Sequence, residues 1–161
     1  MAQADKHLKW CLSDEKRLIK IKPDAKLAQA HLAKSEYNRG VMKILEDAKK
    51  YDWALNAGFY TIYHCFLAIL AKHGYESRNQ SCTATAILTL IEEKKISLDK
   101  ALVLQFDTIE ADKEAADPTI RESREISTYG VKTDINTNQL DKVKALVLKM
   151  QRETIKILNE P

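Results

Sequence analysis

The chain has 161 residues and a mass of 18.4 kDa, the usual size of one domain and enough to bury a hydrophobic core. Apolar residues make up 45% and charged residues 30%, as in soluble globular proteins. No window approaches the roughly 18 consecutive apolar residues of a membrane helix, so no membrane span is expected. The 26 basic residues barely exceed the 23 acidic ones, and a net charge of +3 does not by itself indicate nucleic-acid binding. Only four glycines and three prolines occur, which disfavours many-turned β folds and favours helices.

The three cysteines, Cys11, Cys65 and Cys82, are odd in number and far apart in the sequence. They predict neither a disulfide framework nor a zinc knuckle, and a reducing cytoplasm is the expected location. Residues 1–22 contain scattered charges and no apolar core of a secretory signal. We expect this segment to be an N-terminal extension that precedes a helical domain over residues 23–161.

Two long helices are predicted first along the chain. Asp24 follows Pro23 as a plausible N-cap, and apolar residues then recur every three or four positions, which predicts a helix over residues 24–49. A second helix, capped by Asp52 and apolar on two faces, is predicted to be central and buried. Gly74 is expected to end it, and a loop over residues 74–80 follows.

Four further segments have helical periodicity, and no strand pattern of useful length is found. They are expected at residues 81–93 with Ser81 as N-cap, from Ser97 into the acidic stretch 110–117, at 118–128 with Asp117 as N-cap and Gly130 at its end, and at 137–158. The predicted fold class is therefore all-α, an up-and-down bundle of four main helices plus short extra helices.

Common catalytic motifs are absent from the sequence. It contains no GxxxxGK[ST], GxGxxG, HExxH or GxSxG pattern, and no histidine has a glutamate three residues before it. P-loop, dinucleotide, zinc-protease, hydrolase and di-iron chemistries are thereby disfavoured. No metal or cofactor is expected.

The first local concentration of interest is residues 51–66, where aromatic and small residues alternate along one predicted helix. Small residues allow neighbouring helices to approach while the rings fill the gaps, so a bundle core is the favoured interpretation. His64 falls on the stripe formed by Trp53 and Tyr60. A hydrogen-bonded core role is favoured for it over catalysis.

The second concentration is residues 119–130 with Lys132, where Arg121, Arg124 and Lys132 gather around Tyr129. Guanidinium groups match phosphate oxygens and an aromatic ring can stack on a base, so phosphate or RNA contact is physically reasonable. The alternative is that Arg121 pairs with Glu125 one helical turn later on a solvated face.

Several pieces of the chain, in order, form a recognisable pattern. They are Trp53-Ala54, Tyr60 and Tyr63-His64 in the central helix, residues 67–77 at its end, Asn79-Gln80-Ser81, and Arg124 followed by Tyr129-Gly130. Over about residues 26–158 this order resembles the HEPN domain of prokaryotic proteins.

The resemblance implies a four- or five-helix bundle that dimerises and acts in host defence or in toxin–antitoxin systems. Active HEPN proteins are metal-independent ribonucleases that use an arginine and a histidine, whereas others are binding modules paired with a small nucleotidyltransferase. Arg124 corresponds to the arginine of that motif, but Tyr129 stands at the histidine position. A phenol with a pKa of about 10 is protonated at neutral pH and is a poor general base.

Three hypotheses follow for the function. The first is a HEPN-type homodimer that binds a nucleotide, RNA or a partner protein such as a minimal nucleotidyltransferase. The second is a metal-independent ribonuclease in which Arg124 stabilises charge and Tyr129, or a histidine from elsewhere, moves the proton. The third is a structural helical adaptor. The candidate binding residues are Arg121, Arg124, Tyr129 and Lys132, and the core residues of the motif are Trp53, Tyr60, Tyr63 and His64.

Overall fold

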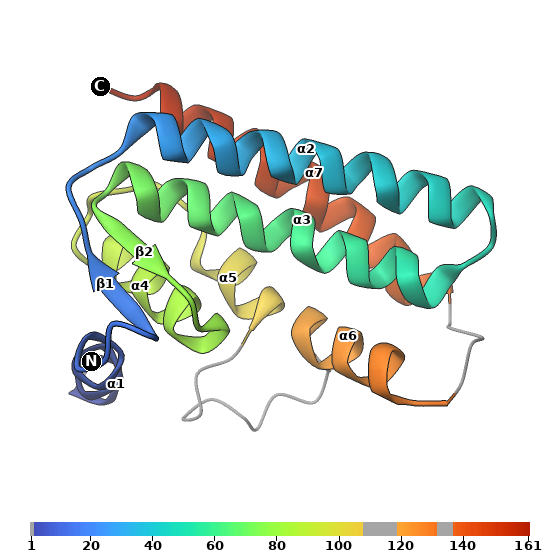
Figure 1. Ribbon diagram of the computed structural model, residues 1–161, viewed down its shortest axis with the longest axis horizontal. Coiled ribbons are helices and arrows are strands. Elements are labelled where there is room, and N and C mark those ends of the chain that lie inside the picture. Colours follow the sequence, from blue (N-terminus) through green and yellow to red (C-terminus); the bar gives the residue numbers. More distant parts are fainter. Residues whose placement is uncertain (1, 108–118, 132–136) are drawn as a thin grey trace.

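The computed structural model describes residues 2–107, 119–131 and 137–161, which form seven helices and two short strands (Figure 1). In chain order these are α1 (Ala2–Leu12), β1 (Leu18–Lys20), α2 (Ala25–Asp47), α3 (Tyr51–Lys72), β2 (Tyr75–Ser77), α4 (Gln80–Glu92), α5 (Lys100–Phe106), α6 (Ile120–Tyr129) and α7 (Thr137–Asn159). Helices account for 75% of the structure, which confirms the all-α class.

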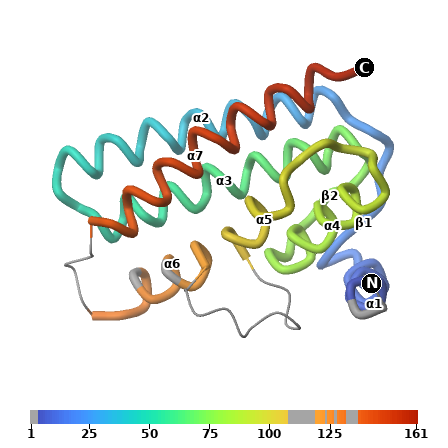
Figure 2. The backbone as a smooth tube through the Cα atoms, turned by 180° about the vertical axis from the view of Figure 1, so that it is seen from behind, coloured from blue at the N-terminus to red at the C-terminus, as the bar shows by residue number. Residues whose placement is uncertain are grey.

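Helix α3 is the centre of the bundle. The long helices α2 and α7 pack along one side of it, and the shorter α4 and α6 contact it from the other (Figures 1 and 2). Three fully buried phenylalanines join α5 to α3, because the ring of Phe106 on α5 lies 4.8 Å from that of Phe59 and 5.0 Å from that of Phe66 on α3. The prediction of a central, buried second helix is confirmed.

By length and mean hydropathy, α3 alone among the helices of the described residues is suited to cross a membrane. The expected absence of a membrane span therefore stays a prediction. However, 67% of its most apolar window is buried inside the bundle. Its hydropathy is explained by contact with neighbouring helices on several sides.

Two predicted helix ends are confirmed in detail. Asp24 caps α2, with its carboxylate accepting a hydrogen bond from the Leu27 backbone N–H at 2.9 Å. Gly74 follows the C-cap of α3 with a φ of +87°, and a Cβ atom built there would lie only 2.9 Å from the carbonyl oxygen of Ile21. Both the left-handed backbone and the close approach require glycine at this position.

The predicted starts of α3 and α4 are wrong. The N-cap of α3 is Lys50, which makes no side-chain capping bond, and Asp52 lies within the first turn. The N-cap of α4 is Asn79, whose side-chain oxygen accepts from the backbone N–H of Cys82 at 3.0 Å. Ser81 is already helical, and its hydroxyl donates to the same oxygen of Asn79.

Whereas α3 and α4 begin earlier than predicted, the next two helices begin later. The N-cap of α5 is Asp99 rather than Ser97. The N-cap of α6 is Thr119, which forms a capping box with Glu122: the Thr119 hydroxyl accepts from the Glu122 N–H at 3.2 Å, and the Glu122 carboxylate accepts from the Thr119 N–H at 3.0 Å. The backbone N–H groups of Thr119 and Glu122, which have no partner within the helix, are thereby both hydrogen-bonded. The predicted cap Asp117 lies outside the described residues.

The N-terminal residues are closely associated with the bundle. Strands β1 and β2 pair in antiparallel register, with Leu18 opposite Ser77 and Lys20 opposite Tyr75, and α1 packs on α4. The prediction that the chain has no strand is wrong, because a three-residue strand is too short to show alternation. The division of the chain at residue 22 stays a prediction.

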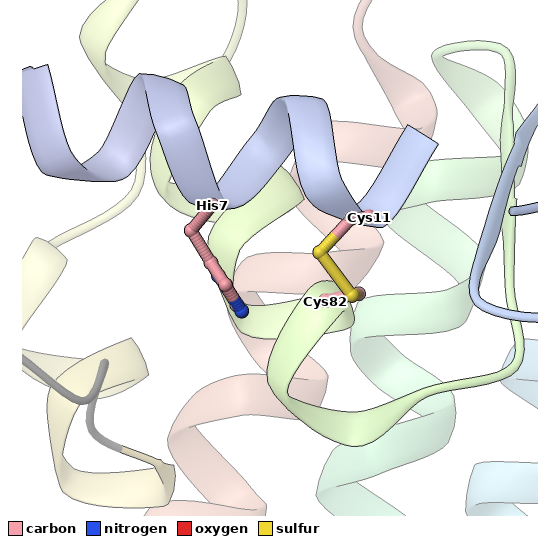
Figure 3. A group of neighbouring side chains, drawn as sticks. All are labelled: His7, Cys11 and Cys82. Atoms are coloured by element: carbon pink, nitrogen blue, oxygen red, sulfur yellow. A yellow bond between two sulfur atoms is a disulfide. The ribbon is translucent and has the colours of Figure 1, made fainter. Parts of the chain in front are cut away.

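A disulfide joins Cys11 at the end of α1 to Cys82 in the first turn of α4, across 71 positions of sequence (Figure 3). The prediction that the cysteines form no such bond is wrong. Sequence distance is a poor guide here, because the pairing of β1 with β2 brings α1 against α4 and places the two Cα atoms 5.7 Å apart. Cys65 is free and buried. Disulfides are typical of oxidising compartments, and the cytoplasmic location stays a prediction.

Candidate functional site

The aromatic residues of α3 differ in their surroundings. Trp53 is 53% exposed, so the structure does not place it in the core as expected. Tyr60 and Tyr63 are partly buried and pack against the core. Their rings lie edge to face 6.4 Å apart, and Tyr63 stacks on Phe59 at 6.1 Å. Tyr60 and Tyr63 therefore line the core, whereas Trp53 lies at the surface.

The hydroxyl of Tyr63 belongs to a polar chain that reaches strand β2. The Thr83 hydroxyl lies 3.3 Å from Tyr63 Oη and 2.7 Å from the Ser77 hydroxyl. Burial raises the pKa of the Tyr63 phenol, and the hydrogen bond with Thr83 partly opposes this shift. Tyr63 is therefore a neutral, positioned hydroxyl at physiological pH.

His64 pairs with His31 on α2. Their Nδ1 atoms are 3.1 Å apart, so one neutral ring donates and the other accepts. Burial, followed by the nearby charges of His31 and Lys34, lowers the pKa of His64 to about 4. Burial also lowers the pKa of His31, although Glu76 opposes this. The hydrogen-bonded role predicted for His64 is consistent with this pairing.

Arg124 on α6 is the most informative of the predicted site residues. It is only 6% exposed, and its guanidinium carbon lies 4.6 Å from the ring centre of Phe59 and 5.8 Å from that of Tyr60. Its Nη2 atom is 3.5 Å from the Glu125 carboxylate, whereas its buried Nε has no hydrogen-bond partner among the described residues. The structure thus places a cation with an unused donor against two aromatic rings.

Arg121 is held by two carboxylates. Its Nη1 lies 3.0 Å from Asp107, which is nearly buried, and its Nε lies 3.3 Å from Glu125. Burial alone would lower the pKa of Arg121, but these two carboxylates raise it above its ordinary value. The helical pair with Glu125, the alternative to ligand binding, is therefore present, and the charge of Arg121 is already compensated.

Tyr129 does not lie with Arg124. It is 79% exposed, whereas Arg124 is buried. Five residues along an α-helix correspond to a rotation of about 140° beyond one full turn, so the two side chains point to different faces. The structure therefore does not bring together the two residues of the proposed catalytic pair. Lys132 lies outside the described residues.

Two polar residues that sequence reasoning missed accompany Arg124. Oδ1 of Asn56 on α3 and the hydroxyl of Thr128 on α6 are buried and have no hydrogen-bond partner among the described residues. Asn56 lies one turn before Tyr60 and Thr128 one turn after Arg124, on helices that contact each other and run in opposite directions (Figure 1). We call Asn56, Arg124 and Thr128 the α3–α6 polar seam. The one amide among the apolar and aromatic residues 53–60 was the available sequence signal.

Comparisons with known proteins give no family for this chain. No family model matches it, and no curated protein matches it either. The resemblance to the HEPN domain therefore stays a prediction that rests on the sequence pattern.

Proposed function

We propose that this chain is a HEPN-type homodimer that binds a nucleotide or RNA at the α3–α6 polar seam. In this proposal it is the binding component of a toxin–antitoxin or defence pair, and a minimal nucleotidyltransferase is its protein partner. The single observation that carries the proposal is the buried guanidinium of Arg124, which has an unused Nε donor and lies against the rings of Phe59 and Tyr60.

Buried polar atoms are nearly always hydrogen-bonded in folded proteins. The seam has three that lack a partner within the described residues: Nε of Arg124, Oδ1 of Asn56 and the hydroxyl of Thr128. A guanidinium donates to phosphate oxygens, an amide oxygen accepts from a base or ribose hydroxyl, and a threonine hydroxyl does either. The donor and acceptor set suits a ligand that carries both phosphate and hydrogen-bonding groups.

The distribution of charge selects Arg124 over Arg121 as the phosphate ligand. Arg121 contacts both Asp107 and Glu125, whereas among the residues that the structure describes Arg124 has one longer carboxylate contact, with the same Glu125. A phosphate would have to compete with Glu125 for Arg124. Replacing this carboxylate, as in Glu125→Gln, is therefore expected to strengthen phosphate binding.

Exposed apolar side chains on α6 support the homodimer. Ile126 and Tyr129 are 68% and 79% exposed, and Val131 directly after the helix is 98% exposed. Burial of such a strip against a second copy is favourable by about 25 cal/mol per Å² of apolar surface. We expect Ile126→Asp to shift the molecular mass measured by light scattering from dimer toward monomer.

Fluorescence anisotropy with a labelled nucleotide and a short single-stranded RNA, both in EDTA, tests the binding proposal. Arg124→Met should weaken binding about 10- to 100-fold, the equivalent of a hydrogen bond to a charged group. The matched control is Arg152→Met on the exposed face of α7, which should change affinity by less than about twofold. Thermal melts of both variants establish that each is folded.

Each other result has a distinct meaning. Failure to bind either ligand contradicts the nucleotide and RNA proposal and leaves complex formation with a nucleotidyltransferase as the assay for the partner. RNA cleavage that persists in EDTA and disappears in Arg124→Met identifies the ribonuclease alternative. If charge reversal at Arg121 and Arg124 changes no interaction, the chain is a structural adaptor.

A further inference from the structure

Three side chains with metal-binding atoms meet where α1 lies against α4. They are His7 and Cys11 on α1 and Cys82 on α4 (Figure 3). A ring nitrogen of His7 and the two sulfur atoms all lie within 4.8 Å of one another. The cluster contains no residue of the α3–α6 polar seam, so inferences about the two sites are independent.

The local fold aligns these three residues. His7 and Cys11 are four residues apart, which places them one above the other on the same face of α1. Cys82 stands in the first turn of α4, which the Asn79 cap fixes through the Cys82 backbone N–H. Both cysteines are fully buried, whereas His7 is partly exposed. The histidine side of the cluster therefore faces solvent.

A hydrogen bond from outside the cluster sets the tautomer of His7. Nδ1 of His7 lies 2.7 Å from the Thr85 hydroxyl, and that hydroxyl donates its hydrogen to the Ser81 carbonyl oxygen at 3.0 Å. Thr85 must therefore accept from Nδ1–H, which leaves the lone pair on Nε2. Metal-binding histidines are commonly oriented in this way, by donating their other N–H to a nearby acceptor.

We propose that, in the reduced chain, His7, Cys11 and Cys82 bind a zinc ion in place of the disulfide. Two electrons from a thiol or phosphine reductant break the S–S bond, and each sulfur takes up one proton while the reductant is oxidised. Zinc then displaces both protons and binds two thiolates and the neutral imidazole. The fourth position of the tetrahedron, on the solvent side, is filled by water.

The geometry and the charge suit this ion. Zinc bonds of about 2.3 Å to sulfur and 2.0–2.1 Å to nitrogen place tetrahedral ligands about 3.5–3.8 Å apart. The three ligand atoms now lie within 4.8 Å of one another, and the two sulfur atoms, which are bonded in the disulfide, would move apart to the zinc-ligand distance after reduction. Two thiolates neutralise one divalent ion, so the buried complex has no net charge and avoids the cost of an unpaired buried charge. Soft thiolate ligands exclude magnesium and calcium, which prefer oxygen.

Cobalt(II) replaces zinc as a coloured probe. The chain is reduced with a phosphine, stripped with EDTA, desalted under argon and titrated with Co²⁺, which gives thiolate charge-transfer bands when bound by cysteine. We expect one equivalent to bind, Zn²⁺ to displace it, and the oxidised chain to bind none. Absence of these bands in the reduced chain, or equal uptake by the oxidised chain, would overturn the proposal.

Variants separate metal binding from the disulfide itself. His7→Gln and Cys82→Ser should each lower zinc affinity by more than about 100-fold, and Thr85→Val by about 10- to 100-fold. The matched controls His73→Gln and Cys65→Ala should leave it unchanged. Since neither His7 nor Thr85 takes part in the disulfide, their variants decide the question even if Cys82→Ser fails to fold. Unchanged zinc affinity in both would refute the site.

Discussion

Replacing Gly58 by alanine is expected to destabilise the bundle. A Cβ atom on Gly58 would lie 2.5 Å from Cγ1 of Val143 on α7 and 3.0 Å from Sδ of Met42 on α2. The methionine is flexible, but the valine is buried and its χ1 is restricted within a helix, so α3 and α7 must separate. Overpacking of this kind costs about 1–3 kcal/mol. Since alanine gains about 1 kcal/mol of helix propensity over glycine, the expected net loss is up to about 2 kcal/mol.

A double-mutant cycle tests the cause. Val143→Ala removes the obstructing methyl group and in that background Gly58→Ala should stabilise by up to about 1 kcal/mol, so that the sign of its effect reverses. Gly40→Ala on α2 is the matched control, because its Cβ meets no atom within 4 Å, and it should stabilise in every background. Urea unfolding followed by far-UV circular dichroism measures all of these values. The packing argument fails if Gly58→Ala behaves like Gly40→Ala, or costs the same with and without Val143.

Three further predictions concern the disulfide, the histidine pair and the seam. Reduction of Cys11–Cys82 in EDTA should lower the free energy of unfolding by up to about 4 kcal/mol, from loop-closure entropy over its 71-residue separation, as measured by urea denaturation with and without reductant. The pKa of His64 is about 4 in the folded chain and 6.5 in the unfolded chain, so its contribution to stability should be complete above pH 6.5 and lost as the pH falls toward 4. His64→Gln should therefore flatten the dependence of Tm on pH in this window. An unchanged dependence would show that the pairing of His64 with His31 does not affect stability. Arg124→Met should leave Tm unchanged or raise it, whereas a clear loss of stability would mean that Arg124 serves the fold.

The order of the long helices could be predicted from sequence because burial on α2 and α7 repeats with the helical period, while α3 is apolar almost throughout. The first residues of the helices could not be predicted, because several residues that can serve as N-caps lie close together in the sequence. Asn79 and Ser81 are both good N-caps by residue type. Only the path of the chain out of β2 decides that Asn79 has the extended backbone a cap requires, with a φ of −133° and a ψ of 128°.

The disulfide and the seam depend on contacts between helices and strands, and therefore could not be predicted from the sequence. The residues near Cys11 do not indicate that Cys82 is its partner. The two cysteines come together because β1 pairs with β2. Arg124 was identified from its place in a motif, but Asn56 and Thr128 become significant only once α3 and α6 are packed together. Local periodicity determines which face of a helix is buried, whereas the neighbour on that face is a property of the whole fold.

The binding role that we propose for the seam would explain why Arg124 is buried at a cost to folding. Removing a guanidinium from water costs several kcal/mol, and an apolar residue of similar length would fill the same space beside Phe59 without that cost. The compensation available to Arg124 is incomplete, because its carboxylate contact within the described part of the chain is the long one to Glu125, which also contacts Arg121. Stacking on the aromatic rings returns about 1–2 kcal/mol. A ligand that completes the hydrogen bonds of Arg124 would recover the remainder, so the free energy missing from the unbound fold is available to drive binding.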